Sequence, residues 1–135
     1  MAVSSIDIPV RFAETDAMGI VHHSNYVIWF EAGRVALMAD AGIPYTDIAA
    51  GGNHFAVTSL QVDYRLPAHF GETVRLMTTV GALRSRQIVF HYVLAGQDGR
   101  ALATGSTEHM CVDLANRTAR IPAPVAAVLQ AFAER

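Results

Sequence analysis

A polar segment that carries acid–base groups stands directly before a long apolar stretch. Asp16, His22 and His23 lie within eight positions, and Glu14 and Asn25 flank them. A carboxylate and an imidazole can both take part in proton transfer near neutral pH. Placing such groups beside a buried element is costly unless they have partners or a chemical role. This segment is therefore the first candidate for a functional site.

Several kinds of site are disfavoured by the residues around it. His22 and His23 are adjacent, so their side chains are expected to point apart, and no cysteine or carboxylate stands at metal-ligand spacing near them. We therefore expect no metal site. The chain has no G-x-S-x-G elbow and no G-x-G-x-x-G after a strand, which disfavours a serine hydrolase and a dinucleotide site.

The stretch that follows has the length of a helix. Residues from Tyr26 to Ala41 are apolar on nearly every side, interrupted only by Glu31, Arg34 and Asp40. A helix that is apolar all round must be buried all round, so a sheet is expected to curl around it. Glu31 and Arg34 lie one turn apart and are expected to form an ion pair inside the fold.

The ends of this helix carry recognisable signals. Ser24 or Asn25 can cap its first turn, and Gly42 with Pro44 soon after marks its end. Gly33 in the middle would cost about 1 kcal/mol relative to alanine. We expect that another backbone passes close to it there, since glycine has no side chain to obstruct the approach.

Four other stretches alternate apolar and polar residues with a period of two, which predicts strands with one buried face. They span residues 6–12, 59–66, 73–80 and 87–94, and a last long strand is predicted at 102–113, after a hairpin turn. Pro9 cannot donate a ladder hydrogen bond, so the first strand should have a free edge. A short turn at 84–86 and a hairpin turn at Asp98-Gly99 join the later strands.

Two further segments complete the chain. Residues 43–53 are predicted to be a connection with at most one short helical turn. The tail after Pro122, through Phe132, is predicted to be a short amphipathic helix. No internal repeat, low-complexity stretch or linker is visible, so residues 1–135 are expected to form one domain.

Composition bounds the function. The net charge of −2 gives no reason to expect a nucleic-acid partner, and all basic residues except histidine are arginine. Cys111 is the single cysteine, which excludes an internal disulfide and suits a reducing cytoplasm. No signal peptide or uncharged run of about 18 apolar residues is present, so we expect a cytoplasmic protein without a membrane span.

Two motifs resemble a known family. The run from Arg11 to Arg34 reads R-F-x-E-T-D-x-x-G-I-V-H-H-S-N-Y-V-x-W-F-E-x-G-R. It resembles the N-terminal signature of hotdog-fold acyl-CoA thioesterases of the 4-hydroxybenzoyl-CoA thioesterase type, and is closest to their Tol-Pal-associated, short-chain acyl-CoA branch. The run from Leu60 to Glu72, L-Q-V-D-Y-R-L-P-A-H-F-G-E, resembles the family's second-strand segment. The resemblance implies an α+β hotdog fold, in which a curled antiparallel five-stranded sheet wraps around one long central helix and a short C-terminal helix follows.

The resemblance also implies roles in thioester hydrolysis. It places the catalytic carboxylate on Asp16, as nucleophile or as general base toward water, and both readings stay open. It places the thioester oxygen at the backbone N–H of His23, where the unpaired N–H groups and the helix dipole favour growing negative charge. The simpler readings are that Asp16 caps a turn and that His23 caps the helix. His22 departs from the aromatic residue usual in relatives, which bears on the shape of the acyl pocket.

Substrate contacts and assembly follow from the same resemblance. Asn25 and Tyr26 are candidate pocket residues, and residues of a partner chain around Val57, Thr58 and Ser59 would close the pocket over Asp16. A homodimer or homotetramer is implied. No separate cofactor is expected, because coenzyme A is part of the substrate. Its phosphates need cations, and the candidates are Arg84, Arg86, Arg117 and Arg120.

Three functions remain in view. The first is hydrolysis of a small acyl-CoA to the free acid and coenzyme A. The second is a hotdog enoyl-CoA hydratase or dehydratase, against which the thioesterase-like spacing of Asp16 speaks. The third is a non-catalytic acyl-CoA-binding protein or a partner of an envelope complex.

Overall fold

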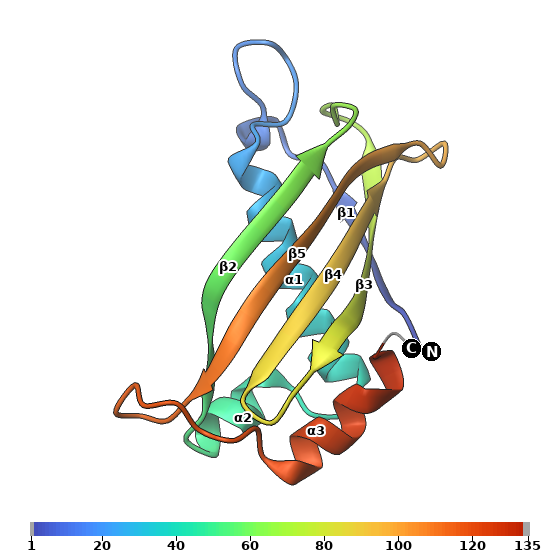
Figure 1. Cartoon of the computed structure of the whole chain (residues 1–135). Coiled ribbons are helices and arrows are strands. Elements are labelled where there is room, and N and C mark those ends of the chain that lie inside the picture. The colour runs from blue at the N-terminus through green and yellow to red at the C-terminus, as the bar shows by residue number, and fades with distance from the viewer. Residues whose placement is uncertain (1, 134–135) are drawn as a thin grey trace.

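The computed structural model describes residues 2–133, and over this range it contains a five-stranded antiparallel sheet and three α-helices (Figure 1). The α+β class and the five-stranded sheet are thus confirmed. The strands are β1 (Ser4–Pro9), β2 (His54–Tyr64), β3 (Thr73–Leu83), β4 (Gln87–Ala95) and β5 (Ala101–Val112). The helices are α1 (Ser24–Asp40), α2 (Tyr45–Ala50) and α3 (Ala123–Leu129), with 3-10 turns at Phe12–Glu14 and Gln130–Phe132.

The sheet order differs from the chain order. Across the sheet the strands run β1-β3-β4-β5-β2, and every neighbouring pair is antiparallel. The chain therefore leaves β2 at one edge and crosses to β3 near the other. The free edge predicted from Pro9 is confirmed, because β1 is an edge strand. The second edge is the much longer β2.

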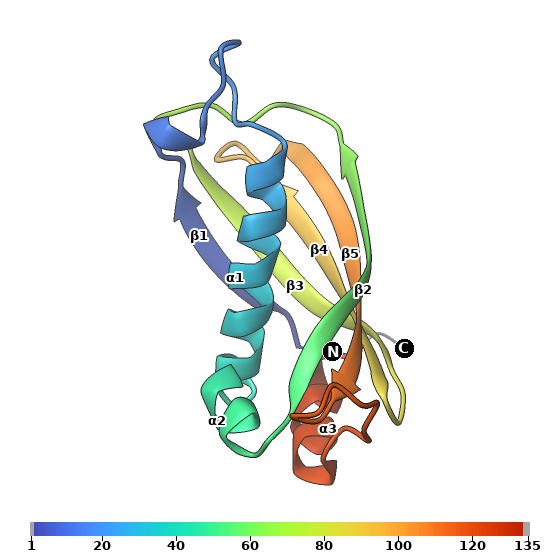
Figure 2. The same cartoon turned by 90° about the vertical axis from the view of Figure 1, so that its left-hand side faces the viewer.

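Helix α1 packs along one face of the sheet, with β1 and β2 on either side of it (Figure 2). Its sheet side buries Tyr26, Trp29, Phe30, Gly33, Leu37 and Met38. Its other side is open, since Ile28 is 56% and Val35 is 44% exposed. The expectation of burial all round is therefore wrong for this chain. One face of the sheet covers only one side of α1. The other two helices, α2 and α3, are short and leave Ile28 and Val35 exposed.

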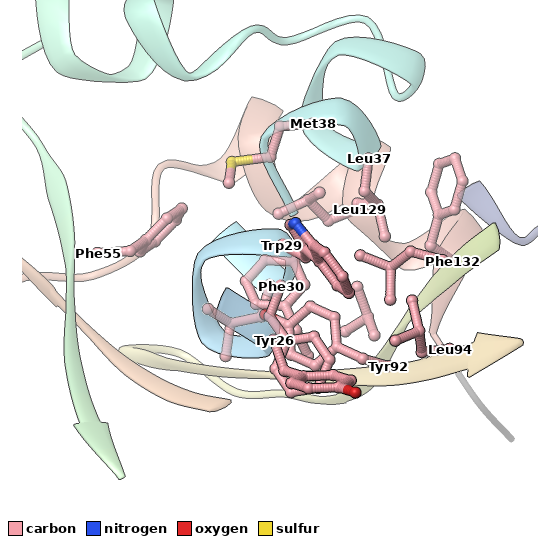
Figure 3. Packing of buried hydrophobic residues seen from close by; sticks show 14 of the residues in the cluster. Tyr26, Trp29, Phe30, Leu37, Met38, Phe55, Tyr92, Leu94, Leu129 and Phe132 are labelled. Carbon is pink, nitrogen blue, oxygen red and sulfur yellow. The ribbon is translucent and has the colours of Figure 1, made fainter. Parts of the chain in front are cut away.

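Aromatic rings fill the space between α1 and the sheet (Figure 3). The rings of Phe30 and Tyr92 stack with centroids 4.3 Å apart, and both side chains are buried. Gly105 of β5 lies under Phe30, where a Cβ atom would stand 2.4 Å from the ring. Each large apolar side chain buried in this way contributes about 1.5–3 kcal/mol, so this packing fixes α1 on the sheet.

Gly33 marks a close approach of α1 to β3. A Cβ atom at this position would lie 2.6 Å from both Leu76 Cδ2 and Thr78 Oγ1. The close neighbour predicted at Gly33 is thus present, but it consists of two β3 side chains and not of a passing backbone. The glycine lets α1 settle onto β3.

Three expected boundaries are wrong. Strand β2 begins at His54, five residues before the predicted start, and its Leu60 and Tyr64 are exposed. As an edge strand, β2 has only β5 beside it, so alternation does not report a buried face there. Phe12 lies in a 3-10 turn and is 73% exposed, outside β1. Residues 45–50 form the six-residue helix α2 instead of a single turn.

A chain of polar side chains is buried between α1 and the sheet. The hydroxyls of Tyr92 and Thr107 are 2.6 Å apart, and Nε2 of His109 lies 2.7 Å from the Thr107 hydroxyl. The Arg34 guanidinium acts electrostatically on both Tyr92 and His109. The ion pairs found among the described residues do not include the expected Glu31–Arg34 pair. Arg34 therefore interacts with this buried series of polar side chains.

Candidate active site

The first backbone N–H of α1 is bonded to the side chain of His22. The N–H of Ser24 donates to His22 Nδ1 at 3.2 Å, and the Ser24 hydroxyl lies 2.8 Å from the same nitrogen. The N–H of Asn25 donates to the His22 carbonyl at 3.0 Å. The expectation that Ser24 or Asn25 caps the helix is wrong. Helix α1 begins at Ser24, two residues before Tyr26, so both residues lie inside it.

His23 occupies the N-cap position of α1. Among residues 2–133, no acceptor is found for its backbone N–H, whereas the N–H groups on either side of it are bonded to Glu14 and His22. An unpaired N–H at the positive end of a 17-residue helix favours an oxygen atom that carries or develops negative charge. The helix mouth therefore offers an oriented donor at His23.

The rings of His22 and His23 lie face to face. Their centroids are 4.1 Å apart with a 30° tilt, so the expectation that the two side chains point apart is wrong. Alternation of neighbouring side chains holds for extended chain, whereas His23 has helical backbone angles. Within the described part of the chain, no group of three or more potential metal-ligating side chains is found.

Asp16 sits at the base of a tight loop. The Thr15 and Val21 backbones pair across the loop, and the Asp16 carboxylate accepts the Met18 N–H at 2.8 Å. Gly19 completes the turn with a φ of +80°, a conformation that glycine adopts at little cost. One carboxylate oxygen of Asp16 thus caps the turn. The other has no protein partner among the described residues.

A pocket of about 300 Å³ opens beside Asp16 and the helix mouth. Three predicted residues, Asp16, His23 and Tyr26, share its wall. Most of the remaining lining is apolar, and Arg65 is its only basic side chain besides His23. The complete lining is Asp16, Met18, Ile20, Val21, His23, Tyr26, Tyr64, Arg65, Leu66 and Pro67. The arrangement puts a carboxylate and an unpaired N–H donor beside one apolar hollow.

Glu14 anchors this arrangement from inside the protein. Its buried carboxylate accepts the Arg11 N–H at 2.7 Å and the Trp29 indole N–H at 2.9 Å. Burial alone would raise the pKa of this carboxyl, but these hydrogen bonds and the Arg11 guanidinium outweigh burial and lower the pKa below its ordinary value. The Glu14 carbonyl also accepts the His22 N–H and the Asn25 amide. Glu14 therefore ties the Asp16 loop to α1.

The other predicted site residues lie outside this pocket. His22 and Asn25 hold the helix start, and Val57, Thr58 and Ser59 lie at a bulge on the exposed edge strand β2. The four candidate arginines lie in the turn between β3 and β4 and in the segment after β5. Figure 1 shows both at the opposite end of the molecule from the N-terminus of α1. These residues are Arg84, Arg86, Arg117 and Arg120.

Sequence reasoning missed the contribution of the segment after β2. Tyr64, Arg65, Leu66 and Pro67 line the pocket, although the alternation pattern predicts a strand there with Tyr64 in the core. The signal that could have indicated these pocket residues is the run L-Q-V-D-Y-R-L-P, which resembles a segment of the thioesterase family. Strand β2 ends beside the start of α1 (Figure 2), so the residues at this end face the helix mouth.

Comparisons with known proteins identify relatives over nearly the whole chain. A family model described as the Thioesterase-like superfamily matches residues 10–131. A Bacillus subtilis protein named "Putative acyl-CoA thioesterase YneP" is 38% identical over 113 residues, which cover 84% of this chain and 82% of the relative.

Two solved structures share the fold. The hypothetical protein TT1821 from Thermus thermophilus superposes with a TM-score of 0.92 and 40% identity, covering 99% of this chain and all of the other. DHNA-CoA thioesterase from Staphylococcus aureus superposes with a TM-score of 0.90 and 31% identity, covering 97% and 93% of the two chains.

Proposed function

Because the chain belongs to the thioesterase-like superfamily, whose hotdog fold it shares, it is a thioester hydrolase, and we propose that it hydrolyses a small acyl-CoA to the free acid and coenzyme A. One observation carries this proposal. Asp16 and His23, whose backbone N–H has no acceptor in the described chain, line the same pocket. A relative named as an acyl-CoA thioesterase supports the substrate class.

The chemistry can run in either of two ways. As nucleophile, the Asp16 carboxylate adds to the thioester carbonyl, expels the coenzyme A thiolate and forms a mixed anhydride that water then cleaves. As general base, Asp16 takes a proton from water as that water adds to the carbonyl. In both, negative charge grows on the carbonyl oxygen, and the His23 N–H at the helix N-terminus stabilises it. When protonated, the His23 imidazole can donate a proton to the departing thiolate.

The pocket supports a small acyl group. Its volume of about 300 Å³ lies at the lower end of the range typical of ligand pockets. Met18, Ile20 and Leu66 supply apolar surface, while Tyr26 and Tyr64 add aromatic rings. Both a short aliphatic and a single-ring aromatic acyl group suit this lining. The short-chain branch suggested by the N-terminal motif is therefore part of our proposal.

The phosphates of coenzyme A require cations near the pocket. Arg65 lines the pocket, and no ion pair to it is found within residues 2–133. It is our candidate within the chain. The four arginines at the opposite end of the molecule, Arg84, Arg86, Arg117 and Arg120, would reach a phosphate only from a partner subunit.

A homodimer would complete the site. The edge strand β2 leaves one side of its backbone unpaired, and Val57 on it is 52% exposed. A long unpaired edge with apolar side chains is the surface on which a second copy can add its own strand. We propose that residues 57–60 of the partner close the pocket over Asp16.

A panel of acyl-CoA esters tests this function. We expect wild-type protein to release free thiol from short aliphatic or single-ring aromatic acyl-CoAs, as measured with a thiol reagent. The matching acyl-N-acetylcysteamine thioesters, which lack the nucleotide, should react with a higher KM. Hydration of an enoyl-CoA without thiol release, or tight acyl-CoA binding without turnover, would contradict the proposal and favour the hydratase or the binding protein.

A further inference from the structure

One hydrogen bond connects the edge of the sheet to the mouth of α1. The Tyr64 hydroxyl, at the end of β2, donates to the backbone carbonyl of His23 at 2.9 Å, across 41 positions of sequence. The Tyr64 ring stands edge-on to the rings of His23 and Tyr26, with centroids 6.4 and 5.1 Å away. Tyr64 therefore contacts the backbone of the residue that carries the unpaired N–H.

A second set of hydrogen bonds holds the preceding peptide group. The His22 carbonyl accepts the backbone N–H of Asn25 at 3.0 Å and the Asn25 side-chain amide at 3.3 Å. A peptide group is planar, so the His22 carbonyl and the His23 N–H turn together. Asn25 thus fixes one peptide plane beside His23, and Tyr64 fixes the other.

This double restraint matters because the donor lies at the very start of the helix. The first N–H groups of a helix have no partner inside it, so no hydrogen bond within the helix holds them in place. A donor stabilises a growing negative charge only when it is already aimed at that oxygen. A displacement of about 1 Å can cost a hundredfold in rate.

We propose that Tyr64 is a positioning residue of the thioesterase reaction: by holding the His23 carbonyl it restrains the backbone angles of His23, and together with Asn25 it keeps the His23 N–H directed at the thioester oxygen. This inference rests on the proposed function. Tyr64 lies on the edge strand β2, so this strand would help to orient the N–H donor at the start of α1. Tyr64 does not need to touch the reacting atoms to act in this way.

The Tyr64 hydroxyl is suited to remain a donor. Burial raises its pKa above the ordinary value of 10.0, so the proton needed for the bond to His23 stays in place at neutral pH. Tyr45 supplies a matched comparison. Its hydroxyl lies 3.0 Å from His54 Nδ1, a bond of similar length between α2 and β2 and outside the pocket.

The test compares Tyr64→Phe with Tyr45→Phe in the full chain. Each variant loses one hydroxyl hydrogen bond and keeps its ring, so similar melting temperatures are expected. For Tyr64→Phe we expect kcat to fall about tenfold with KM within twofold of wild type. For Tyr45→Phe both constants should stay near wild type. A Tyr64→Phe variant with unchanged kcat, or with a loss confined to KM, would overturn the inference.

The position of the donor can also be read without turnover. In ¹H–¹⁵N spectra the His23 amide signal should move in Tyr64→Phe and not in Tyr45→Phe. An unmoved His23 signal would count against a positioning role even if activity fell. Should the wild-type protein release no thiol at all, the proposed function fails, and the His23 signal still decides whether Tyr64 orients this amide.

Discussion

At the scale of single residues, the acids around the pocket differ in how far protein partners engage their carboxylates. Asp16 keeps one carboxylate oxygen free of protein partners within the described chain. Glu14, two positions earlier, has its carboxylate engaged by Arg11 and Trp29. The spacing in sequence does not distinguish these two acids. The two acids differ in burial and in hydrogen bonding. The burial of Glu14 and its bond to the Trp29 indole depend on the position of Trp29 in the folded protein.

Residue types predicted part of the site and left out the rest. Asp16, His23 and Tyr26 were expected in one site, and they share the wall of the pocket. Their roles in catalysis remain predictions. The alternation of residues 59–66 predicts Tyr64 on the buried face of a strand, but alternation indicates which residues share a face and not whether that face is covered. Its contact with His23 spans 41 positions, beyond the reach of any local pattern.

His109 makes a prediction about pH and stability. Burial and the Arg34 guanidinium lower the pKa of His109 from 6.5 to about 4. Below pH 6.5 the unfolded chain therefore binds a proton at this histidine that the folded chain does not bind until pH reaches about 4. Because the unfolded state is favoured as it gains protons, this histidine should lower the free energy of unfolding by about 1–2 kcal/mol between pH 6.5 and 5.

Urea denaturation at several pH values measures this effect. A His109→Gln variant should lose the corresponding part of the pH dependence, whatever its stability at pH 7. His69→Gln, at an exposed position, is the control and should retain the wild-type dependence. The same slope in wild type and His109→Gln would show that His109 does not titrate as described.

At the scale of elements, the pattern of alternation worked where a strand has neighbours on both sides. The predicted strand 87–94 matches β4, which lies between β3 and β5. It failed for β2, whose first residues, His54 to Thr58, lack a simple alternation of burial. Helix α1 was predicted at nearly its full length, but its exposed side was not. Because apolar residues such as Ile28 and Val35 also occupy the exposed side, the pattern does not distinguish that side from the one that faces the sheet.

Gly33→Ala tests the packing of α1 on β3. Alanine favours a helix by about 1 kcal/mol over glycine. Its Cβ atom would lie 2.6 Å from Leu76 Cδ2 and Thr78 Oγ1, both in buried side chains of the sheet. Overpacking of a core costs about 1–3 kcal/mol, so after the gain in helix propensity we expect a net loss of about 0–2 kcal/mol and a melting temperature no higher than that of wild type.

The matched control for Gly33→Ala reverses the substitution at a neighbouring exposed site. Ala32→Gly should lose about 1 kcal/mol through helix propensity alone. Thermal melts of both variants give the comparison. A Gly33→Ala protein that is more stable than wild type would mean that α1 does not approach β3 as closely as described.

At the scale of the whole molecule, two sets of candidate phosphate-binding arginines lie far apart. Arg65 lines the pocket, whereas the turn and the segment that carry Arg84, Arg86, Arg117 and Arg120 lie at the opposite end from the start of α1 (Figure 1). The edge strand β2 runs between those ends, and the open side of α1 exposes Ile28 and Val35. Both features are explained if a second copy covers them. In the described part of the chain, no helix is long and apolar enough to cross a membrane.

Val57→Arg tests the proposed dimer. A charged side chain at this exposed apolar position of the β2 edge should oppose pairing of two edges, because it would have to be desolvated in the contact. We expect sedimentation to show monomers and thiol release to fall. Val93→Arg, on the central strand β4, is the control and should leave the β2 contact intact. A monomeric wild type, or a Val57→Arg protein that still forms dimers, would contradict the assembly.

The reaction itself is tested most directly by Asp16→Asn. Asparagine keeps an oxygen that can accept the Met18 N–H, so the loop and the melting temperature should be preserved. It removes the charge needed for attack or for proton abstraction, and kcat for thiol release should fall at least about a hundredfold. Asp47→Asn, an exposed acid in α2, should retain wild-type activity. Thiol release by Asp16→Asn within twofold of the wild-type rate would contradict the role given to Asp16.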